Sequence, residues 1–198
     1  MQEVKEGLVV ETDTPRIIKY RQLILELLLG RSPKTPYLME LAAKHGVSES
    51  RFLTGESDDC VRCGRCIRVC REKIRAYALC FEGRGSNRNV TTAFGRLSES
   101  CIGCGACAQV CPTGAIRVAD RGDERKISIW GQVLARFKLE RCTHCGRPFA
   151  PKKYLELINR KAYRPKGIEF INYICPECFK TGDRASQARK AGALRRRV

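Results

Sequence analysis

The chain reads DCVRCGRCIRVCRE from Asp59 to Glu72 and SCIGCGACAQVCPT from Ser100 to Thr113. Both stretches separate four cysteines by two, two and three residues. This spacing is typical of loops that bind cubane [4Fe-4S] clusters, because three closely spaced thiolates can surround one face of the cubane. A cubane needs four thiolates, so one ligand of each cluster must come from elsewhere in the chain. The repeat therefore predicts two iron-sulfur centres.

The fourth cysteine of each stretch is expected to serve the other cluster, as it does in proteins of the two-cluster ferredoxin type. The ligands predicted for the first cluster are Cys60, Cys63, Cys66 and Cys111. Those predicted for the second cluster are Cys70, Cys101, Cys104 and Cys107. Because this crossing holds two redox centres side by side, we expect an α+β fold with a bacterial two-cluster ferredoxin-like domain and a role in electron transfer.

Two other uses of these eight cysteines are less consistent with the sequence. Disulfides would require an oxidising compartment, but the chain opens with MQEVKE, which is not a signal peptide, so reduced thiols and a cytoplasmic location are expected. Zinc sites also use Cys-x2-Cys pairs, but a third cysteine at the same interval and a fourth after three more residues exceed what one tetrahedral ion binds. Iron-sulfur binding remains the prediction for both stretches.

A second cysteine pattern follows, with two Cys-x2-Cys pairs separated by 29 residues. Its members are Cys142, Cys145, Cys175 and Cys178. Four thiolates satisfy one tetrahedral ion, so a structural Zn²⁺ in a zinc-ribbon-like module is the first choice, while a third iron-sulfur cluster or a single iron would accept the same ligands. His144 lies inside the first pair but is not needed as a ligand. The long gap leaves room for a helix over 152–160.

We expect four segments along the chain: an N-terminal extension with two helices (1–56), the two-cluster domain (57–130), the four-cysteine metal module (131–180) and a basic C-terminal tail (181–198). Thr14 followed by Pro15 predicts the start of the first helix, and Gly30 predicts its end. The second helix is expected over 37–45. Further along, alternating apolar and polar residues predict a short strand over 127–130.

The formal net charge of +17 is compatible with several kinds of partner, and much of the excess lies in the last segment. An acidic patch on a protein, an anionic membrane surface and nucleic acid would each attract it, while a solvated tail needs no partner. Nucleic acid is not favoured, because aromatic residues are few and are not interleaved with the basic ones. No apolar run approaches the roughly 20 residues of a membrane-spanning helix, so no transmembrane segment is predicted.

The residues around the cysteines narrow the family further. The first cysteine stretch is followed in order by FEGRG (81–85), AFG (93–95) and CPTGAI (111–116), and it is preceded by EGLVVETDTP (6–15). Over about residues 5 to 118 the chain thus resembles the large iron-sulfur subunit of respiratory complex I, the iron hydrogenases, and the iron-sulfur subunits of NAD-linked hydrogenases and formate dehydrogenases. The run from Cys142 to Ala150 is similar to the cysteine-rich end of a ferredoxin-like subunit of formate hydrogenlyase.

Two features of the complex I family are missing. Its members usually begin with a [2Fe-2S] domain, and this chain is expected to start just after that point. They also hold a further cluster with one His and three cysteines, whereas residues 32–52 contain no cysteine and only His45. A Gly-rich dinucleotide fingerprint is absent too, so the resemblance implies a shortened relay that does not oxidise a nicotinamide by itself.

The resemblance implies an iron-sulfur electron-transfer subunit of a multisubunit, cytoplasmic and anaerobic oxidoreductase of the hydrogenase, formate dehydrogenase, or molybdenum or tungsten enzyme type. Catalytic and other redox subunits would be its partners in a hetero-oligomer. No acid-base pair or nucleophile arrangement is recognisable, so the chain itself is expected to be non-catalytic. Two alternatives remain open: a redox-sensing nucleic-acid-binding regulator, and a mainly structural scaffold subunit.

Overall fold

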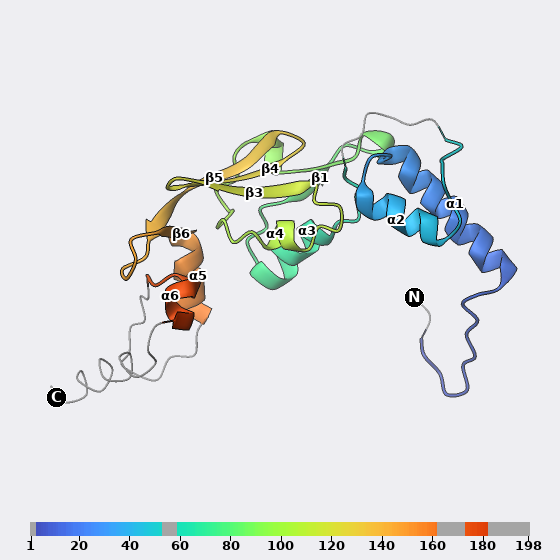
Figure 1. Cartoon of the computed structure of the whole chain (residues 1–198), viewed down its shortest axis with the longest axis horizontal. Coiled ribbons are helices and arrows are strands. Elements are labelled where there is room, and N and C mark those ends of the chain that lie inside the picture. The colour runs from blue at the N-terminus through green and yellow to red at the C-terminus, as the bar shows by residue number, and fades with distance from the viewer. Residues whose placement is uncertain (1–2, 53–58, 162–172, 182–198) are drawn as a thin grey trace.

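The computed structural model describes residues 3–52, 59–161 and 173–181. Figure 1 shows an elongated arrangement with three parts in chain order: a pair of helices at one end, a middle part of short helices and strands, and a smaller part with two helices at the other end. The mixture of helices and strands is consistent with the predicted α+β class. The finer assignment to a two-cluster ferredoxin-like domain stays a prediction.

The N-terminal part is built from α1 (Pro15–Arg31) and α2 (Pro36–Lys44). Thr14 caps α1, since its hydroxyl accepts a hydrogen bond from a backbone N–H of the first turn at 3.3 Å. The predicted start is confirmed, but the helix passes through the predicted stop, because Gly30 is buried inside the last turn and Ser32 is the C-cap. The two helices share a core of Leu25, Leu29, Leu38, Ala42 and Val47.

The middle part begins with the first cysteine stretch, which forms a helical turn, α3, and then a π-helical turn, η1. The second stretch forms a similar turn, α4. Their bounds are Arg65–Arg68 for α3, Val69–Ile74 for η1 and Ala106–Gln109 for α4. Between η1 and α4 the chain forms a two-stranded antiparallel sheet and two 3-10 turns, in the order β1 (Cys80–Glu82), η2 (Gly85–Asn87), β2 (Asn89–Thr91) and η3 (Ala93–Gly95).

Four antiparallel strands then join the middle part to the C-terminal part, in the order β3, β4, β5, β6. Their bounds are Ile116–Arg121, Glu124–Ile129, Gln132–Arg141 and Pro148–Pro151. The strand predicted over 127–130 belongs to β4, which starts three residues earlier than expected and stops one residue sooner. β4 and β5 pair directly across residue 131, with Ile129 opposite Gln132. The sheet therefore runs through the position where the sequence suggests a domain division, and that division stays a prediction.

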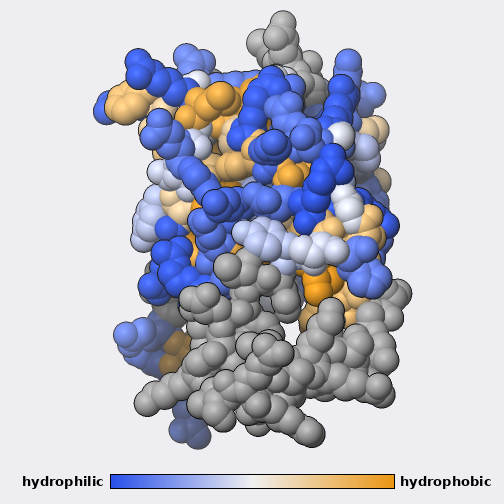
Figure 2. Space-filling model, turned by 90° about the vertical axis from the view of Figure 1, so that its left-hand side faces the viewer, coloured by the Kyte–Doolittle hydropathy of each residue, from blue (hydrophilic) through white to orange (hydrophobic). Residues whose placement is uncertain are grey.

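The C-terminal part adds two helices, α5 (Lys152–Lys161) and α6 (Pro176–Thr181). α5 confirms the helix predicted over 152–160. Where its described residues are visible in Figure 2, this end of the molecule is mostly hydrophilic, with small scattered apolar patches. Apart from Thr181, the predicted basic tail lies outside the described residues. None of the described helices combines the length and the apolar character needed to cross a membrane.

The main core lies between the cysteine stretches and the sheet. Its most buried members, each at most 3% exposed, are Val90, Ile116, Ile127, Ile129 and Leu134. Cys60 and Cys66 belong to the same cluster of packed residues. Two of the predicted ligands are therefore part of the hydrophobic core, so their sulfur atoms are shielded from water by the fold itself.

Candidate metal centres

The two cysteine stretches fold into matching loops, each ending in a short helix. Gly64 and Gly105 adopt left-handed backbone angles, with φ of 72° and 75°, directly before α3 and α4. The third cysteine of each run, Cys66 or Cys107, then lies in the first turn of that helix. Because glycine adopts a positive φ without a steric penalty, the Cys-Gly-x-Cys order found in both runs suits this turn.

One cavity is lined by the four cysteines of the predicted first ligand set, Cys60, Cys63, Cys66 and Cys111. The rest of its wall is mostly apolar and includes Val90, Ile116 and Ile129. Cys60 and Cys66 are buried, whereas Cys63 is exposed. Cys63 is therefore the most exposed of the four cysteines that line this first cavity.

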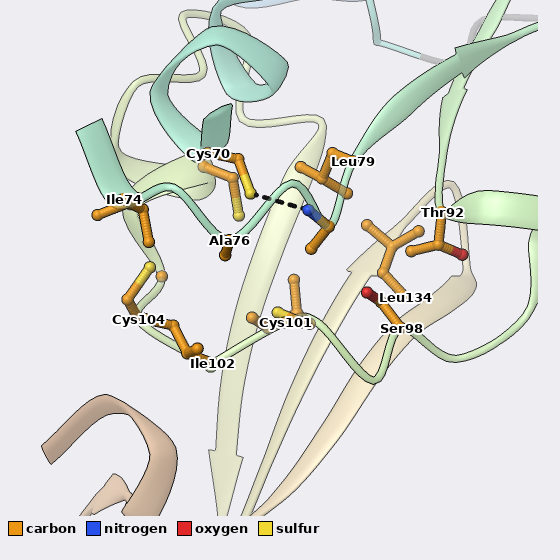
Figure 3. A pocket seen from close by; sticks show the side chains of 15 residues that line it. Cys70, Ile74, Ala76, Leu79, Thr92, Ser98, Cys101, Ile102, Cys104 and Leu134 are labelled. Atoms are coloured by element: carbon orange, nitrogen blue, oxygen red, sulfur yellow. Dashed lines mark hydrogen bonds between the residues drawn. The ribbon is translucent and has the colours of Figure 1, made fainter. Parts of the chain in front are cut away.

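A second cavity is lined by the four cysteines of the other predicted set, Cys70, Cys101, Cys104 and Cys107. In Figure 3, Cys70 enters from the end of the first stretch, and Cys101 and Cys104 come from the second loop. The side chains of Ile74, Leu79, Ile102 and Leu134 supply apolar walls. In both cavities the fourth cysteine of one run lies with the first three of the other. The cysteines predicted to share a cluster are thus brought together, while their role as ligands stays a prediction.

The buried thiols of Cys66 and Cys107 strongly disfavour ionisation by themselves. Burial, followed by the neighbouring charge of Cys60, raises the pKa of Cys66 to about 12. Burial also raises the pKa of Cys107 to about 12, and the cysteines that add to this rise include Cys66. Cys66 lines the first cavity, Cys107 lines the second, and Cys107 packs against the core cluster that contains Cys66. Several buried thiolates need a compensating cation, and an iron-sulfur core supplies one. The donor set and the apolar walls fit a [4Fe-4S] cluster in each cavity.

Hydrogen-bond donors also lie close to the sulfur atoms of Cys70 and Cys111, the fourth cysteine of each run. The Ala78 N–H donates to Cys70 Sγ at 3.4 Å (Figure 3). Cys111 Sγ lies 3.6 Å from Thr113 Oγ1. Burial opposes the ionisation of Cys111, but backbone N–H groups, that of Ile116 foremost, and the Thr113 hydroxyl together lower its pKa. Such donors stabilise negative charge on a thiolate and on a cluster bound to it.

The four sulfur atoms of the C-terminal module are gathered more tightly. The Sγ atoms of Cys142, Cys145, Cys175 and Cys178 all lie within 4.8 Å of one another, and those of Cys145 and Cys175 are 3.8 Å apart. Four thiolates bound to one ion at about 2.3 Å lie about 3.8 Å from one another in a regular tetrahedron. Elsewhere in the described residues, no group of three or more Cys, His, Asp or Glu side chains is close enough to hold a single ion. The module therefore contains a four-cysteine site that fits one tetrahedral ion.

Backbone N–H groups also point at the sulfurs of this site. The Cys175 N–H lies 3.3 Å from Cys142 Sγ and lowers the pKa of that thiol to about 6. The Cys178 N–H lies 3.5 Å from Cys175 Sγ. The Cys178 thiol is hydrogen-bonded to Cys145, which raises the pKa of Cys178 to about 12. His144 is exposed and lies outside the group of four.

Two arginines contact the cluster loops. Arg62 lies in the first loop, donates a hydrogen bond to Cys60 O, and stacks over the ring of Trp130 at 5.3 Å. Arg125 reaches the second loop from β4 and donates to Gly103 O. The place of Arg62 between two predicted ligands is a signal for its role. Nothing in the local sequence links Arg125 to a loop 22 residues away.

Comparisons with known proteins agree with the iron-sulfur assignment. A model described as a 4Fe-4S binding domain matches residues 57–73, and a model described as a 4Fe-4S dicluster domain matches residues 100–149. The chain therefore contains 4Fe-4S ferredoxin-type domains. The dicluster match covers the second run and continues past Cys142 and Cys145, so it does not determine the number of clusters.

One subunit of an NADH-quinone oxidoreductase of Rhizobium meliloti (strain 1021) is 32% identical to the chain over the matched region. This region covers 47% of the chain and only 14% of that protein, so the chain spans a small part of the relative's length. The predicted resemblance to a complex I iron-sulfur subunit is confirmed in outline. The particular subfamily and the missing domains stay predictions.

Proposed function

We propose that the chain is an electron-transfer subunit of a multisubunit oxidoreductase, and that it relays electrons through two [4Fe-4S] clusters. The first cluster would be bound by Cys60, Cys63, Cys66 and Cys111. The second would be bound by Cys70, Cys101, Cys104 and Cys107. The observation that carries the proposal is the pair of largely apolar cavities, each lined by one of these sets of four cysteines.

The residues of the chain suit a relay. A [4Fe-4S] cluster, when bound, takes up and releases single electrons. The walls of both cavities are mostly apolar, and the N–H groups near Cys70 and Cys111 favour negative charge at the sulfur atoms. Cys66 lines the first cavity and Cys107 the second, and Cys107 packs against the core cluster that contains Cys66, so electrons would cross there. The exposed Cys63 makes the first cavity the natural place for exchange with a partner.

The third site is proposed to hold a structural Zn²⁺. Its close sulfur spacing supports a single ion, because a cubane core would separate the thiolates more widely than one metal does. Zinc has no redox chemistry, so this ion would stabilise the module and would not carry electrons.

The partners are proposed from the similarity to one subunit of an NADH-quinone oxidoreductase. Catalytic and other redox subunits would bind the chain in a cytoplasmic, anaerobic complex of the hydrogenase, formate dehydrogenase, or molybdenum or tungsten enzyme type. The chain itself would turn over no substrate.

Metal analysis of anaerobically purified protein tests the cofactor content. We expect about eight irons and one zinc per chain, with electron paramagnetic resonance (EPR) signals of reduced [4Fe-4S] clusters. About twelve irons without zinc would assign a third cluster to the four-cysteine site. Protein without any reducible cluster would overturn the proposed function, and tight, salt-sensitive DNA binding in its place would favour a regulator.

Paired substitutions test the crossed ligand sets. Cys60→Ala combined with Cys111→Ala removes two ligands of one cluster, so about four irons should remain. Cys60→Ala combined with Cys70→Ala removes one ligand from each cluster, so both EPR signals should be weakened or altered. The opposite pattern, in which the Cys60 and Cys70 pair abolishes a single cluster, would show that each run binds its own cluster.

A further inference from the structure

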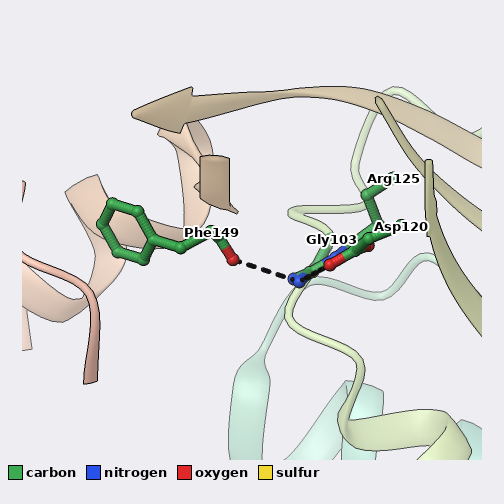
Figure 4. Close-up of polar contacts among 4 residues, drawn as sticks. All are labelled: Gly103, Asp120, Arg125 and Phe149. Carbon is green, nitrogen blue, oxygen red and sulfur yellow. Dashed lines mark hydrogen bonds and ion pairs between the residues drawn. The ribbon is translucent and has the colours of Figure 1, made fainter. Parts of the chain in front are cut away.

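Arg125 lies where the second cluster loop meets the four-cysteine module (Figure 4). It extends from β4, and its side chain is only 13% exposed. Asp120 of β3 accepts two hydrogen bonds from it, 2.8 Å from Nε to Oδ1 and 2.7 Å from Nη2 to Oδ2. A bidentate pair of this kind fixes the plane of the guanidinium, which stays charged at physiological pH.

The same guanidinium also bonds to two segments that are far apart in the sequence. Its Nη1 donates to Gly103 O at 3.0 Å, and its Nη2 donates to Phe149 O at 3.2 Å. Gly103 lies within the Cys-x2-Cys turn of the second loop, and Phe149 lies on β6, four residues after Cys145. Arg125 therefore bridges a loop of the second cavity and β6, the strand that follows the Cys142–Cys145 pair of the module (the first knuckle).

Direct packing reinforces this bridge. Gly103 has a φ of 72°, and a Cβ at this position would lie 2.6 Å from Pro151 Cγ and 2.8 Å from Phe137 Cδ2. Pro151 ends β6 and Phe137 lies in β5. These two strands therefore press against the loop so closely that no side chain fits between them.

The knuckle is connected to β6 through the backbone. The Cys142 N–H donates to Arg147 O at 2.8 Å, and the Gly146 N–H donates to Cys142 O at 2.9 Å, so the knuckle closes immediately before the strand. An ion bound by the four cysteines would hold this closure, because ligation in a small module supplies folding free energy. Without the ion, β6 would keep its pairing with β5 but would lose the support of the closed loop that precedes it.

Arg125 also brings positive charge to the second cavity. Its Nη1 lies 3.0 Å from the carbonyl oxygen of Gly103, the residue directly before Cys104. A nearby cation favours the more negative, reduced state of a redox centre. Loss of this charge should therefore make the second cluster harder to reduce.

We propose that Arg125 is a positioning residue that couples the four-cysteine module to the second cluster, while the first cluster is not part of this link. This inference rests on the proposed function, because it concerns a bound, reducible cluster. The first loop is held by other contacts. Val61 packs on the core of α1 and α2, and the Thr35 hydroxyl donates to Asp59 Oδ1 at 3.3 Å.

A double-mutant cycle tests the coupling. In a Cys60→Ala, Cys111→Ala background, the remaining EPR signal belongs to the second cluster. Arg125→Met should lower its midpoint potential. Cys178→Ser, which removes a ligand of the module, should shift the potential in the same direction, because the guanidinium is then held less firmly. Together the two changes should shift it by less than the sum of their separate effects, since both break the same bridge.

The controls separate this bridge from general damage. Arg117→Met removes an exposed positive charge from β3 and should leave the potential unchanged. Arg125→Lys keeps the charge but cannot bridge both carbonyls, so it should shift the potential less than Arg125→Met does. If Arg125→Met does not accumulate as folded protein, Arg125→Lys takes its place in the cycle, with the same less-than-additive result expected.

The outcomes are distinct. In a Cys70→Ala, Cys101→Ala background, which retains the first cluster, neither Arg125→Met nor Cys178→Ser should move the potential. Additive shifts of the second cluster, or an equal response of the first, would overturn the coupling and leave the proposed function intact. Absence of any reducible cluster in the unmodified protein would overturn both, and it is seen before a variant is made.

Discussion

The loop between Cys60 and Cys63 carries Arg62 at the position where the loop between Cys101 and Cys104 carries Gly103. Both residues have a left-handed backbone, with φ of 53° and 72°. Arg62 uses its side chain to hold its own loop, donating to Arg88 O at 2.8 Å and to Asn89 Oδ1 at 2.7 Å. Gly103 has no space for a side chain, and its carbonyl accepts a hydrogen bond from Arg125 of β4. Two loops with the same cysteine spacing and similar turns are thus held by different means.

The flanking parts of the chain differ in the same way. The helical pair α1–α2 supports the first loop through Val61 and Asp59. The C-terminal strands support the second loop through Gly103. Each predicted cluster therefore has a separate structural neighbour, so a change in one flank should reach mainly one cluster.

The largest effect is expected at Gly103. Gly103→Ala places a Cβ against Pro151 in a left-handed backbone, so we expect a loss of about 2–5 kcal/mol of stability, from about 1–2 kcal/mol of backbone strain and about 1–3 kcal/mol of overpacking. Gly105→Ala is the matched control, because it has a similar φ but its Cβ would lie 3.6 Å from Val118 Cγ2, an ordinary contact. Anaerobic thermal unfolding should show the Gly103 variant melting several degrees below the control. Equal melting temperatures would contradict the tight packing of this loop.

A smaller loss is expected in the helical pair. Leu38 is 2% exposed in the core on which Val61 rests, and Leu38→Ala should destabilise this part by about 2–3 kcal/mol. The first cluster should then release iron faster, as followed by its EPR signal, while the second is unchanged. The neighbouring Met39 is 53% exposed, so Met39→Ala should have little effect. Equal loss of both clusters in the Leu38 variant would show that the flanks are not separate.

The smallest effect separates backbone strain from side-chain contacts at Arg62. Arg62→Ala and Arg62→Gly both remove the hydrogen bonds of the guanidinium, but only alanine keeps a Cβ at positive φ. We expect the alanine variant to be about 1 kcal/mol less stable than the glycine variant, which corresponds to about 2–4 °C in melting temperature for a chain of this size. An alanine variant as stable as the glycine variant would contradict the left-handed geometry of this position.

Local signals in the sequence predict local features well. Thr14 and Pro15 mark the start of α1, because a cap and an N-terminal proline act within one turn. The helix predicted over 152–160 is likewise present as α5. The strand predicted over 127–130 is found only in part, because its length depends on pairing with β3 and β5. Arg125 carries no local signal, since its partners come from three separate segments.

Cysteine spacing by itself predicted iron-sulfur binding, because three thiolates two residues apart suit one face of a cubane and the fourth must come from another segment. Spacing also identified the four members of the C-terminal site. Only the tertiary structure decided that β5 and β6 press on the second loop, that Arg125 joins this loop to the module, and that the four sulfurs of the third site lie within 4.8 Å of one another. These facts depend on distances between segments far apart in the chain, which local sequence patterns do not encode.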